Sequence, residues 1–588
     1  ATRNTAAMIR INSSAGICLA LLATYALVVC HAALASPSMQ IRRSFSSPLR
    51  TQTWESLRRA QLAKEIFTTD VDSENTQVCL RIRGGSSGTG METNLGISFK
   101  EKSAFDAARG AVHTKFICTL GPKTQSVEMI SKLIEAGMNV ARMNFSHGDH
   151  KYHAQTIANV REALKQSKRM CALALDTKGP EIRTGKIQGG GDVELVAGQE
   201  FTLVNDFEHV GDSKTIGQSY PKLSEVLEVG SEVLIDDGLI SMTVVSKTPT
   251  SVTCKVANNG LLGQNKGINL PGAVVDLPAL TERDKTDLAF GCEQGVDFIF
   301  ASFIRQGEQV REIRRHLEAC GGGHVRVISK IENQEGLQNF DEILAESDGI
   351  MVARGDMGVE IPVEKVAIAQ KMIISKCNVA GKPVVTATQM LESMIVNPRP
   401  TRAETTDVAN AVFDGTDCVM LSGETAKGKY PILAIETMVR ICREAEKVVD
   451  YTPSYVAMRR HGGDVTSLMS VDEAIASSAV KTAFDLRAKL ILCLTMSGRT
   501  ARLICKYRPV APILCATADE QTARHCMVLR GCYPMVMGSL MGLASVISRC
   551  VATAKVNGLV HSGDVVVVVS GVKEVTGATN DLRVLKVE

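Results

Sequence analysis

The chain has 588 residues, of which 45% are hydrophobic and 22% charged, and its formal net charge is only +3. The length indicates several domains. The small net charge, the single tryptophan and the eight tyrosines exclude a basic, aromatic nucleic-acid platform, so no nucleic acid is expected as a partner. The seventeen cysteines form no Cys-x-x-Cys pair and mostly fall in apolar segments, which predicts buried, reduced thiols.

Residues 1–95 are predicted to be an N-terminal extension. Ile17–Ala35 is apolar and ends in small residues, and Ser36–Thr53 is rich in serine and arginine without any acid. This pattern is typical of a two-step address to an organelle, a plastid or a mitochondrion. The alternatives are an upstream gene-model extension, with Met91 as the true start, and a membrane span, for which the run is barely long enough. We favour the gene-model extension and a cytoplasmic protein.

From Ala111 onward, apolar runs alternate with helical patterns. Runs that are apolar throughout predict parallel strands buried on both faces. We expect eight such strands: Thr114–Thr119, Asn139–Phe145, Met170–Asp176, Phe298–Phe303, Val325–Ile331, Gly349–Ala353, Pro383–Thr388 and Cys418–Leu421. Their alternation with helices predicts a (β/α)8 TIM barrel built from residues 96–178 and 277–450.

Two further domains are expected. Residues 179–276 interrupt the barrel after its third strand with short alternating runs rich in Gly, Val and Thr, which predicts an inserted all-β lid domain. Residues 451–588 alternate helix and strand again, which predicts a C-terminal open α/β domain. Its expected elements are the helices Ser470–Leu486 and Thr500–Tyr507 and the strands Leu490–Thr495, Ile513–Thr517 and Asp564–Ser570.

The segment Val325–Met394 carries the strongest chemical signal. Lys330 and Glu332 are two residues apart on a strand and therefore face the same side. Asp356 follows the next strand, so one Mg²⁺ (or Mn²⁺) ion could contact both carboxylates, and the lysine beside it favours a phosphate-bearing substrate. A structural Lys–Glu ion pair explains this triplet equally well.

Helices are expected between these strands. Their predicted ranges are Glu335–Glu346 and Val363–Val379, and another helix is expected to begin at Gln389. Thr388 would then lie at a helix N-terminus, which is either an anion site or a simple cap.

Five motifs together resemble the pyruvate kinase family. They are Asn144–Gly148 (NFSHG), Asp176–Arg183 (DTKGPEIR), Ser329–Asn333 (SKIEN), Ala353–Asp356 (ARGD) and Ala387–Met394 (ATQMLESM). The resemblance covers the chain from about Ala111 to its end. It implies an Mg²⁺- and K⁺-dependent glycolytic enzyme that transfers the phosphoryl group of phosphoenolpyruvate to ADP, giving pyruvate and ATP.

The resemblance also implies roles for single residues. The catalytic residues would be Lys330, Arg142, Arg183 and Thr388. The substrate would contact Arg142, Lys330, Gly355, Asp356 and Thr388. The nucleotide would contact Asn144, His147, Arg183, Lys266, Pro122 and Tyr152.

A potassium site is implied at Asn144, Ser146, Asp176 and Thr177. From the residues alone, these oxygens suit a monovalent cation, but ordinary hydrogen bonding is the more frequent use of such groups. Glu181 matches the glutamate of potassium-requiring members of the family.

An effector site is implied in the last domain. Thr495, Ser497, Gly498, Arg499 and Thr500 join a strand to a helix, where hydroxyl and backbone N–H groups form a phosphate cradle. The later loop offers Lys573 beside Glu574 instead of the Trp-Arg pair of members that respond to fructose bisphosphate. We therefore expect a sugar monophosphate effector, or none, in a homotetramer that the family resemblance implies.

Two other functions fit the sequence less well. A catalytically silent relative that only binds sugar phosphates is disfavoured because Lys330, Glu332, Asp356 and Thr388 are all present. A barrel lyase acting on acids similar to phosphoenolpyruvate is disfavoured by the inserted β domain and the third domain.

Overall fold

The structure is a computed structural model, and it describes residues 67–71, 78–82, 112–167, 169–461, 469–571 and 579–588. The apolar run at 17–35 lies outside these residues. Among the described helices, none combines the length and apolarity needed to cross a bilayer. Within the predicted extension, the described part is a hairpin in which β1 (Phe67–Val71) pairs antiparallel with β2 (Val78–Ile82). A lone two-stranded hairpin is only marginally stable in water.

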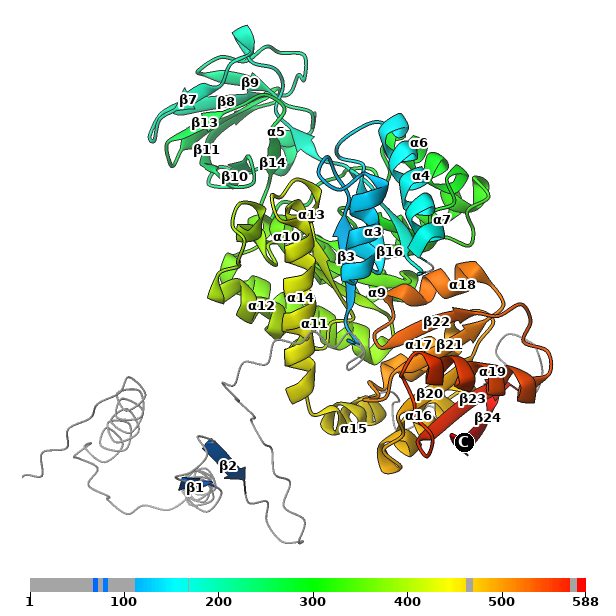
Figure 1. The fold of residues 1–588 in the computed structure, drawn as a ribbon. Helices are drawn as coiled ribbons and strands as arrows, with labels where there is room; N and C mark the ends of the chain where they lie inside the picture. The colour runs from blue at the N-terminus through cyan, green and yellow to red at the C-terminus, as the bar shows by residue number, and fades with distance from the viewer. Residues whose placement is uncertain (1–66, 72–77, 83–111, 168, 462–468, 572–578) are drawn as a thin grey trace, which may run out of the picture. The chain divides into compact units, whose positions relative to one another are not determined.

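Eight parallel strands close into a barrel, which confirms the predicted architecture (Figure 1). The strands are β3 (Lys115–Thr119), β4 (Val140–Asn144), β5 (Ala172–Asp176), β15 (Phe298–Ala301), β16 (Arg326–Ile331), β17 (Gly349–Ala353), β18 (Val384–Ala387) and β19 (Cys418–Leu421). Their carboxyl ends meet at one mouth, where TIM barrels place their chemistry.

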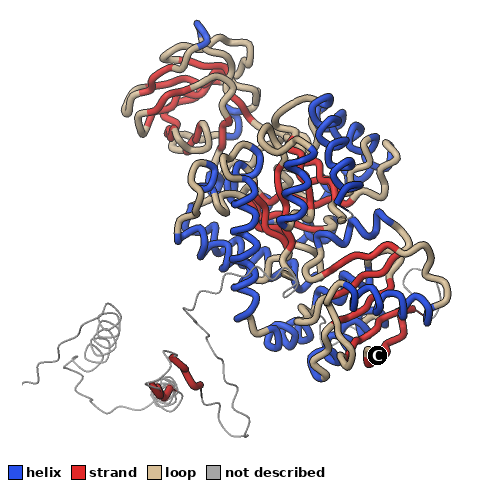
Figure 2. The backbone as a smooth tube through the Cα atoms, viewed as in Figure 1, coloured by secondary structure: helices blue, strands red, loops and turns tan. Residues whose placement is uncertain are grey.

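The barrel closes because its strands are apolar on both faces. Ile117, Phe300, Ile328, Met351 and Val385 belong to one buried cluster inside the barrel. The alternate residues of the same strands belong to a larger cluster shared with the surrounding helices. Figure 2 shows these helices around the strands.

The barrel helices have the bounds α3 (Val127–Ala136), α4 (His150–Ser167), α6 (Glu282–Glu293), α7 (Gly307–Ala319), α8 (Gln334–Gln338), α9 (Phe340–Glu346), α10 (Arg354–Glu360), α11 (Val363–Ala380), α12 (Arg402–Asp414), α13 (Gly423–Ala426) and α14 (Pro431–Val448). The predicted single helix 335–346 is wrong, because it is two helices, α8 and α9. Asn339 separates them and donates its side-chain amide to the Arg305 carbonyl at 2.9 Å. Asparagine commonly makes such side-chain-to-backbone bonds at helix boundaries.

The lid domain follows β5 and has its own hydrophobic core. Its main sheet has the order β6-β14-β10-β11-β12-β8-β9, and β13 pairs with β7. The elements are β6 (Ile182–Arg183), η1 (Gln188–Gly190), β7 (Val193–Leu195), β8 (Glu200–Val204), β9 (Thr215–Gly217), α5 (Leu223–Val226), β10 (Glu232–Ile235), β11 (Ile240–Thr248), β12 (Ser251–Val256), β13 (Gly260–Leu262) and β14 (Gly267–Asn269).

The C-terminal domain is an open sheet with the order β22-β21-β20-β23-β24, in which only β24 is antiparallel. Buried clusters pack on both faces of this sheet. Its elements are α15 (Tyr451–His461), α16 (Val471–Asp485), β20 (Leu490–Leu494), α17 (Arg499–Lys506), β21 (Ile513–Thr517), α18 (Glu520–His525), η3 (Cys526–Val528), β22 (Cys532–Val536), α19 (Leu543–Val556), β23 (Val565–Gly571) and β24 (Thr579–Lys586).

The amino ends of the barrel strands contact the C-terminal domain. Lys115, at the start of β3, donates to the Cys532 carbonyl at 2.5 Å. Asp417, just before β19, forms an ion pair with Arg508 at 2.6 Å. The domain interface thus lies at the amino ends of the strands, and the mouth at their carboxyl ends remains available for an active site.

From Cys118 to Cys550 the cysteines are free thiols, and all but Cys292 and Cys320 are buried. The prediction of buried, reduced thiols is therefore confirmed for these residues.

A buried carboxylate fixes the entry of the chain into the barrel. Glu446, on α14, accepts hydrogen bonds from the backbone N–H of His113 at 2.9 Å and of Thr114 at 2.7 Å. Burial alone would raise the pKa of Glu446, but the bonds from His113 and Thr114 and the charge of Arg530 lower it to about 2. The folded state therefore releases this proton more readily than the unfolded state.

We expect Glu446→Gln to lower the free energy of unfolding by about 2–3 kcal/mol at pH 7. The carboxylate's contribution is complete above about pH 5 and is lost as the pH falls toward 2. Thermal denaturation of wild type and variant at pH 7 and pH 4 measures the difference. Glu444→Gln on the exposed side of α14 is the control, and an equal effect of both substitutions would contradict this role.

Candidate active site at the barrel mouth

A buried charge cluster lies at the carboxyl ends of β5 and β16. The Lys330 ammonium lies 3.2 Å from Asp176 Oδ1, 2.9 Å from Glu332 Oε1 and 2.7 Å from the Ser302 hydroxyl. Lys330 and Glu332 therefore do face the same side of their strand. Both residues are buried, Lys330 at 8% exposure and Glu332 at 0%.

The surroundings keep the lysine charged. Burial alone would lower the pKa of Lys330, but the Asp176 and Glu332 carboxylates outweigh burial and raise it. Burial raises the pKa of Glu332 to about 7; the nearby charge of Asp356 also raises it and the Lys330 ammonium opposes the rise. The site thus combines a fixed cation, Lys330, with a carboxylate, Glu332, whose ionised form would be stabilised by a further positive charge.

A second cation, Arg142, binds the same aspartate from β4. Its Nε lies 2.6 Å from Asp176 Oδ2, and its Nη1 donates to the Thr119 hydroxyl at 2.7 Å. Burial would raise the pKa of Asp176, but Arg142 and Lys330 overcome this effect and lower it. One buried carboxylate therefore orients two cations toward the barrel mouth.

Glu332 and Asp356 fit the predicted divalent cation. Glu332 Oε1 is buried and makes no hydrogen bond of good geometry, although the Lys330 ammonium is within ion-pair distance. Asp356 lies in the first turn of α10 and is near enough to raise the pKa of Glu332. In the described part of the chain, no cluster of three or more Asp, Glu, His or Cys side chains is arranged to hold a metal. Two carboxylates completed by substrate and water oxygens are the arrangement typical of Mg²⁺.

The four residues of the predicted potassium site lie on β4, β5 and the segments that follow them. Asn144 is the register neighbour of Asp176. Its Oδ1 accepts the backbone N–H of Ser146 at 3.1 Å, and the Thr177 hydroxyl accepts that of Ser302 at 3.1 Å. The donor set is all oxygen with one carboxylate, which fits a monovalent cation.

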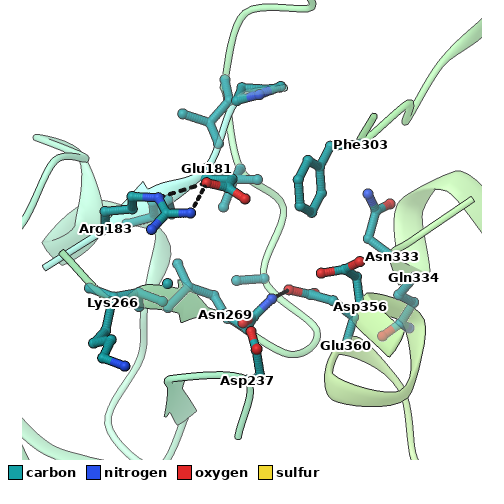
Figure 3. A pocket seen from close by; sticks show the side chains of 18 of the residues that line it. Glu181, Arg183, Asp237, Lys266, Asn269, Phe303, Asn333, Gln334, Asp356 and Glu360 are labelled. Carbon is teal, nitrogen blue, oxygen red and sulfur yellow. Dashed lines mark hydrogen bonds and ion pairs between the residues drawn. The ribbon is translucent and has the colours of Figure 1, made fainter. Parts of the chain in front are cut away.

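A cavity of about 420 Å³ lies between the lid domain and the barrel. Figure 3 shows Arg183 and Lys266 on its lid side, and Asp356 on its barrel side. Arg183 forms an ion pair with Glu181 at 2.5 Å, and Lys266 forms one with Asp236 at 2.8 Å.

Arg183 lines the same cavity as Asp356, and its ion-pair partner there is Glu181. Glu181, which matches the glutamate of potassium-requiring members, is the carboxylate of this ion pair.

Thr388 is not at a helix N-terminus, and this prediction is wrong. Both Thr388 and Gln389 have positive φ angles, 72° and 55°, and the next helical element is the short 3₁₀ helix η2 (Glu392–Ile395). A β-branched residue rarely adopts a positive φ, so the surroundings must hold this turn. Arg354 does so by donating to the carbonyls of Ala387 at 3.1 Å and Thr388 at 2.7 Å.

Gly355 permits the close approach of this turn to α10. A Cβ atom at position 355 would lie 2.7 Å from the Thr388 methyl group. Gly355, Asp356 and Thr388 line a second cavity of about 710 Å³ at the mouth. These three predicted substrate residues are thus brought together.

The remaining predicted nucleotide residues lie at the surface near the ends of β3 and β4. Pro122 and His147 are exposed and Tyr152 is partly exposed. The His147 carbonyl accepts a hydrogen bond from the His153 ring at 2.8 Å, which ties the loop to α4.

The predicted effector loop is held by internal hydrogen bonds. The Thr495 hydroxyl accepts the Gly498 N–H at 3.0 Å, Arg499 pairs with Asp472 at 2.5 Å, and the Thr500 hydroxyl lies 2.6 Å from that of Thr579. Lys573 and Glu574, on which the expected effector preference depended, lie outside the described residues.

Sequence reasoning missed two residues of the site, Ser302 and Arg354. Ser302 bonds the Lys330 ammonium and lies 3.3 Å from Asp176. Its position just after a barrel strand was a usable signal, because polar residues at carboxyl ends face the mouth. Arg354 forms an ion pair with Asp407 at 2.7 Å. No sequence pattern indicated its contacts with the loop after β18.

Known proteins of one family resemble this chain in sequence and in fold. Residues 111–435 match the family model described as "Pyruvate kinase, barrel domain", and residues 473–585 match "Pyruvate kinase, alpha/beta domain". The chain is 53% identical over 483 residues to a pyruvate kinase from Dictyostelium discoideum, covering 81% of this chain and 94% of the relative. It is 50% identical over 503 residues to one from Eimeria tenella, covering 85% and 94%. A crystal structure of a pyruvate kinase from Cryptosporidium parvum superposes with a TM-score of 0.78 at 47% identity, covering 81% and 96%.

Proposed function

The chain belongs to the pyruvate kinase family, and we propose that the charge cluster at the barrel mouth carries out its reaction, phosphoryl transfer from phosphoenolpyruvate to ADP. The observation that supports this most directly is the Lys330 ammonium, buried and held charged 2.9 Å from Glu332. Phosphoryl transfer depends mainly on positioning and on neutralising the charge of the transferring group.

Each cation has a proposed role. Lys330 and Arg142 face the mouth from β16 and β4 and would stabilise charge on the transferring phosphoryl group. Arg183 and Lys266 would bind phosphate groups once a substrate anion replaces Glu181 and Asp236 as their partners. Both exchanges occur on the lid, so lid movement would couple substrate entry to charge rearrangement.

Glu332 and Asp356 would hold Mg²⁺ or Mn²⁺, which neutralises phosphoryl and substrate oxygens when bound. Thr388 and Gly355 would face the substrate carboxylate, and the Thr388 hydroxyl would lie on the route by which the enolate is protonated. The fixed turn at Thr388, clamped by Arg354, supports a positioning role for this loop.

Potassium would bind at Asn144, Ser146, Asp176 and Thr177. The all-oxygen donor set and its single carboxylate support this site. Because Asp176 also holds Arg142 and Lys330, a cation there would adjust the field around both.

Regulation is proposed at the loop of Thr495–Thr500, with a sugar monophosphate as effector, in a homotetramer. The short helix-starting loop with its hydroxyls supports a single phosphate cradle. A cytoplasmic location is supported by the free, buried thiols, which are typical of a reducing compartment.

We expect Lys330→Met to lower the rate of pyruvate formation from phosphoenolpyruvate and ADP by about 10²–10³-fold or more, because one preorganised charge is removed. A coupled turnover assay measures the rate, and circular dichroism checks the fold. The same substitution at the partly exposed Lys285, on α6, is the control and should leave the rate unchanged. A folded Lys330→Met variant with wild-type turnover would refute the assignment.

Turnover should also require potassium. Replacing KCl by tetramethylammonium chloride at equal ionic strength should reduce turnover by about tenfold or more, equivalent to about 1.4 kcal/mol of transition-state stabilisation. Glu181→Lys should reduce this requirement by placing an ammonium group near the mouth. Full activity of the wild type in tetramethylammonium chloride would exclude the potassium site.

A further inference from the structure

A third cavity lies at the opposite end of the barrel from the active site. It has a volume of about 490 Å³ and separates the amino ends of the barrel strands from the C-terminal domain. Its charged or titratable side chains include three from the barrel and three from the C-terminal domain: Arg314, Arg326, Lys382, Arg499, Arg502 and His525.

Positive charge predominates in this interdomain cavity. Five Arg and Lys side chains line it, against the two carboxylates of Glu346 and Asp348. Asp348 is already bound by Arg314 at 2.7 Å and by Arg326 at 3.2 Å. Glu346 is bound by Arg311 at 2.8 Å, and Arg499 by Asp472 at 2.5 Å. Lys382 donates to the backbone carbonyls of Leu344 and Ala345. Lys382 and Arg502 are thus the cations of the cavity that have no carboxylate partner among the described residues, and an entering anion would meet their positive charge.

Two polar side chains in the cavity have unused hydrogen-bonding capacity. Arg502, on α17, is partly buried, and among the described residues no hydrogen bond or ion pair is found for its guanidinium. His525 Nε2 is buried and likewise has no partner in the described part of the chain. Burial and the charge of Arg326 lower the pKa of His525 to about 4, so this ring is a neutral donor or acceptor at pH 7. Buried polar groups without partners are costly, and a ligand that satisfies them recovers that cost.

The rest of the cavity defines what kind of anion fits. The start of α17, at Ser497 and Gly498, lines the cavity, although the Gly498 N–H is already donated to the Thr495 hydroxyl at 3.0 Å. Phe298, Ile328 and Val528 form an apolar part of its wall. Several donors beside an apolar wall match a phosphate group attached to an apolar or aromatic body.

We propose that this interdomain cavity binds a phosphate monoester of a small organic molecule, with its phosphate on Arg502 and Lys382 and its apolar body against Phe298 and Val528. The site adjoins the proposed effector cradle, since Ser497, Gly498 and Arg499 line it, but it does not include Thr495 or Thr500, and the Thr500 hydroxyl is directed to Thr579. Its two main anchors come from different domains, so a bound ligand links the barrel to the C-terminal domain.

Phenyl phosphate is a suitable probe, and isothermal titration calorimetry on the full chain at constant ionic strength measures its binding. We expect one saturable site per chain and weaker binding of inorganic phosphate, which lacks the apolar body. Arg502→Met should weaken phenyl phosphate binding about tenfold or more through loss of a charge-assisted contact. Arg583→Met, on β24 and outside the cavity, is the matched control and should bind like the wild type.

Two further variants keep the proposal falsifiable. Lys382→Met, on the opposite wall, should weaken binding even if Arg502→Met does not fold, whereas Thr500→Val in the effector cradle should have no effect. The proposal is overturned if no saturable binding occurs, if Arg502→Met and Lys382→Met both bind like the wild type, or if Thr500→Val abolishes binding. Equal weakening by Arg583→Met, or equal affinity for inorganic phosphate, would also overturn it.

Discussion

The arrangement of charges at the barrel mouth depends on one buried carboxylate, that of Asp176. It binds Arg142 and Lys330 at once, and both cations come from other strands. Desolvating three charges is expensive unless they neutralise one another in good geometry, and here each has a close partner. The charge thereby becomes a fixed feature of the barrel, available to a phosphoryl group without reorganisation.

The groups on the lid and on the loops around this charge cluster are held less firmly. Arg183 and Lys266 form ion pairs with carboxylates of the lid, and each can exchange that partner for a ligand anion. The Thr388 turn is held by Arg354 and needs the absence of a Cβ at Gly355. In the proposed function, the buried cluster would supply electrostatic stabilisation, and these elements of the lid and loops would contact the ligands.

Most of the barrel could be predicted from the sequence, because strands buried on both faces are apolar throughout and their polar ends mark the mouth. The common orientation of Lys330 and Glu332 followed from their spacing, whereas their catalytic role was implied by the family resemblance. The helix at Gln389 could not be excluded, since only the tertiary contacts of Arg354 impose left-handed backbone there. The break at Asn339 and the Glu181–Arg183 pair likewise depend on partners distant in sequence or on local geometry that periodicity does not reveal.

The central claim is that Glu332 and Asp356 form a cation site beside the charge of Lys330. Titration of the full chain with Mn²⁺, followed by electron paramagnetic resonance, tests this without relying on turnover. The account predicts that Glu332→Gln weakens Mn²⁺ binding by about tenfold or more, whereas Lys330→Met, which removes a competing cation, binds at least as tightly as the wild type. Unchanged Mn²⁺ affinity in a folded Glu332→Gln variant would contradict it.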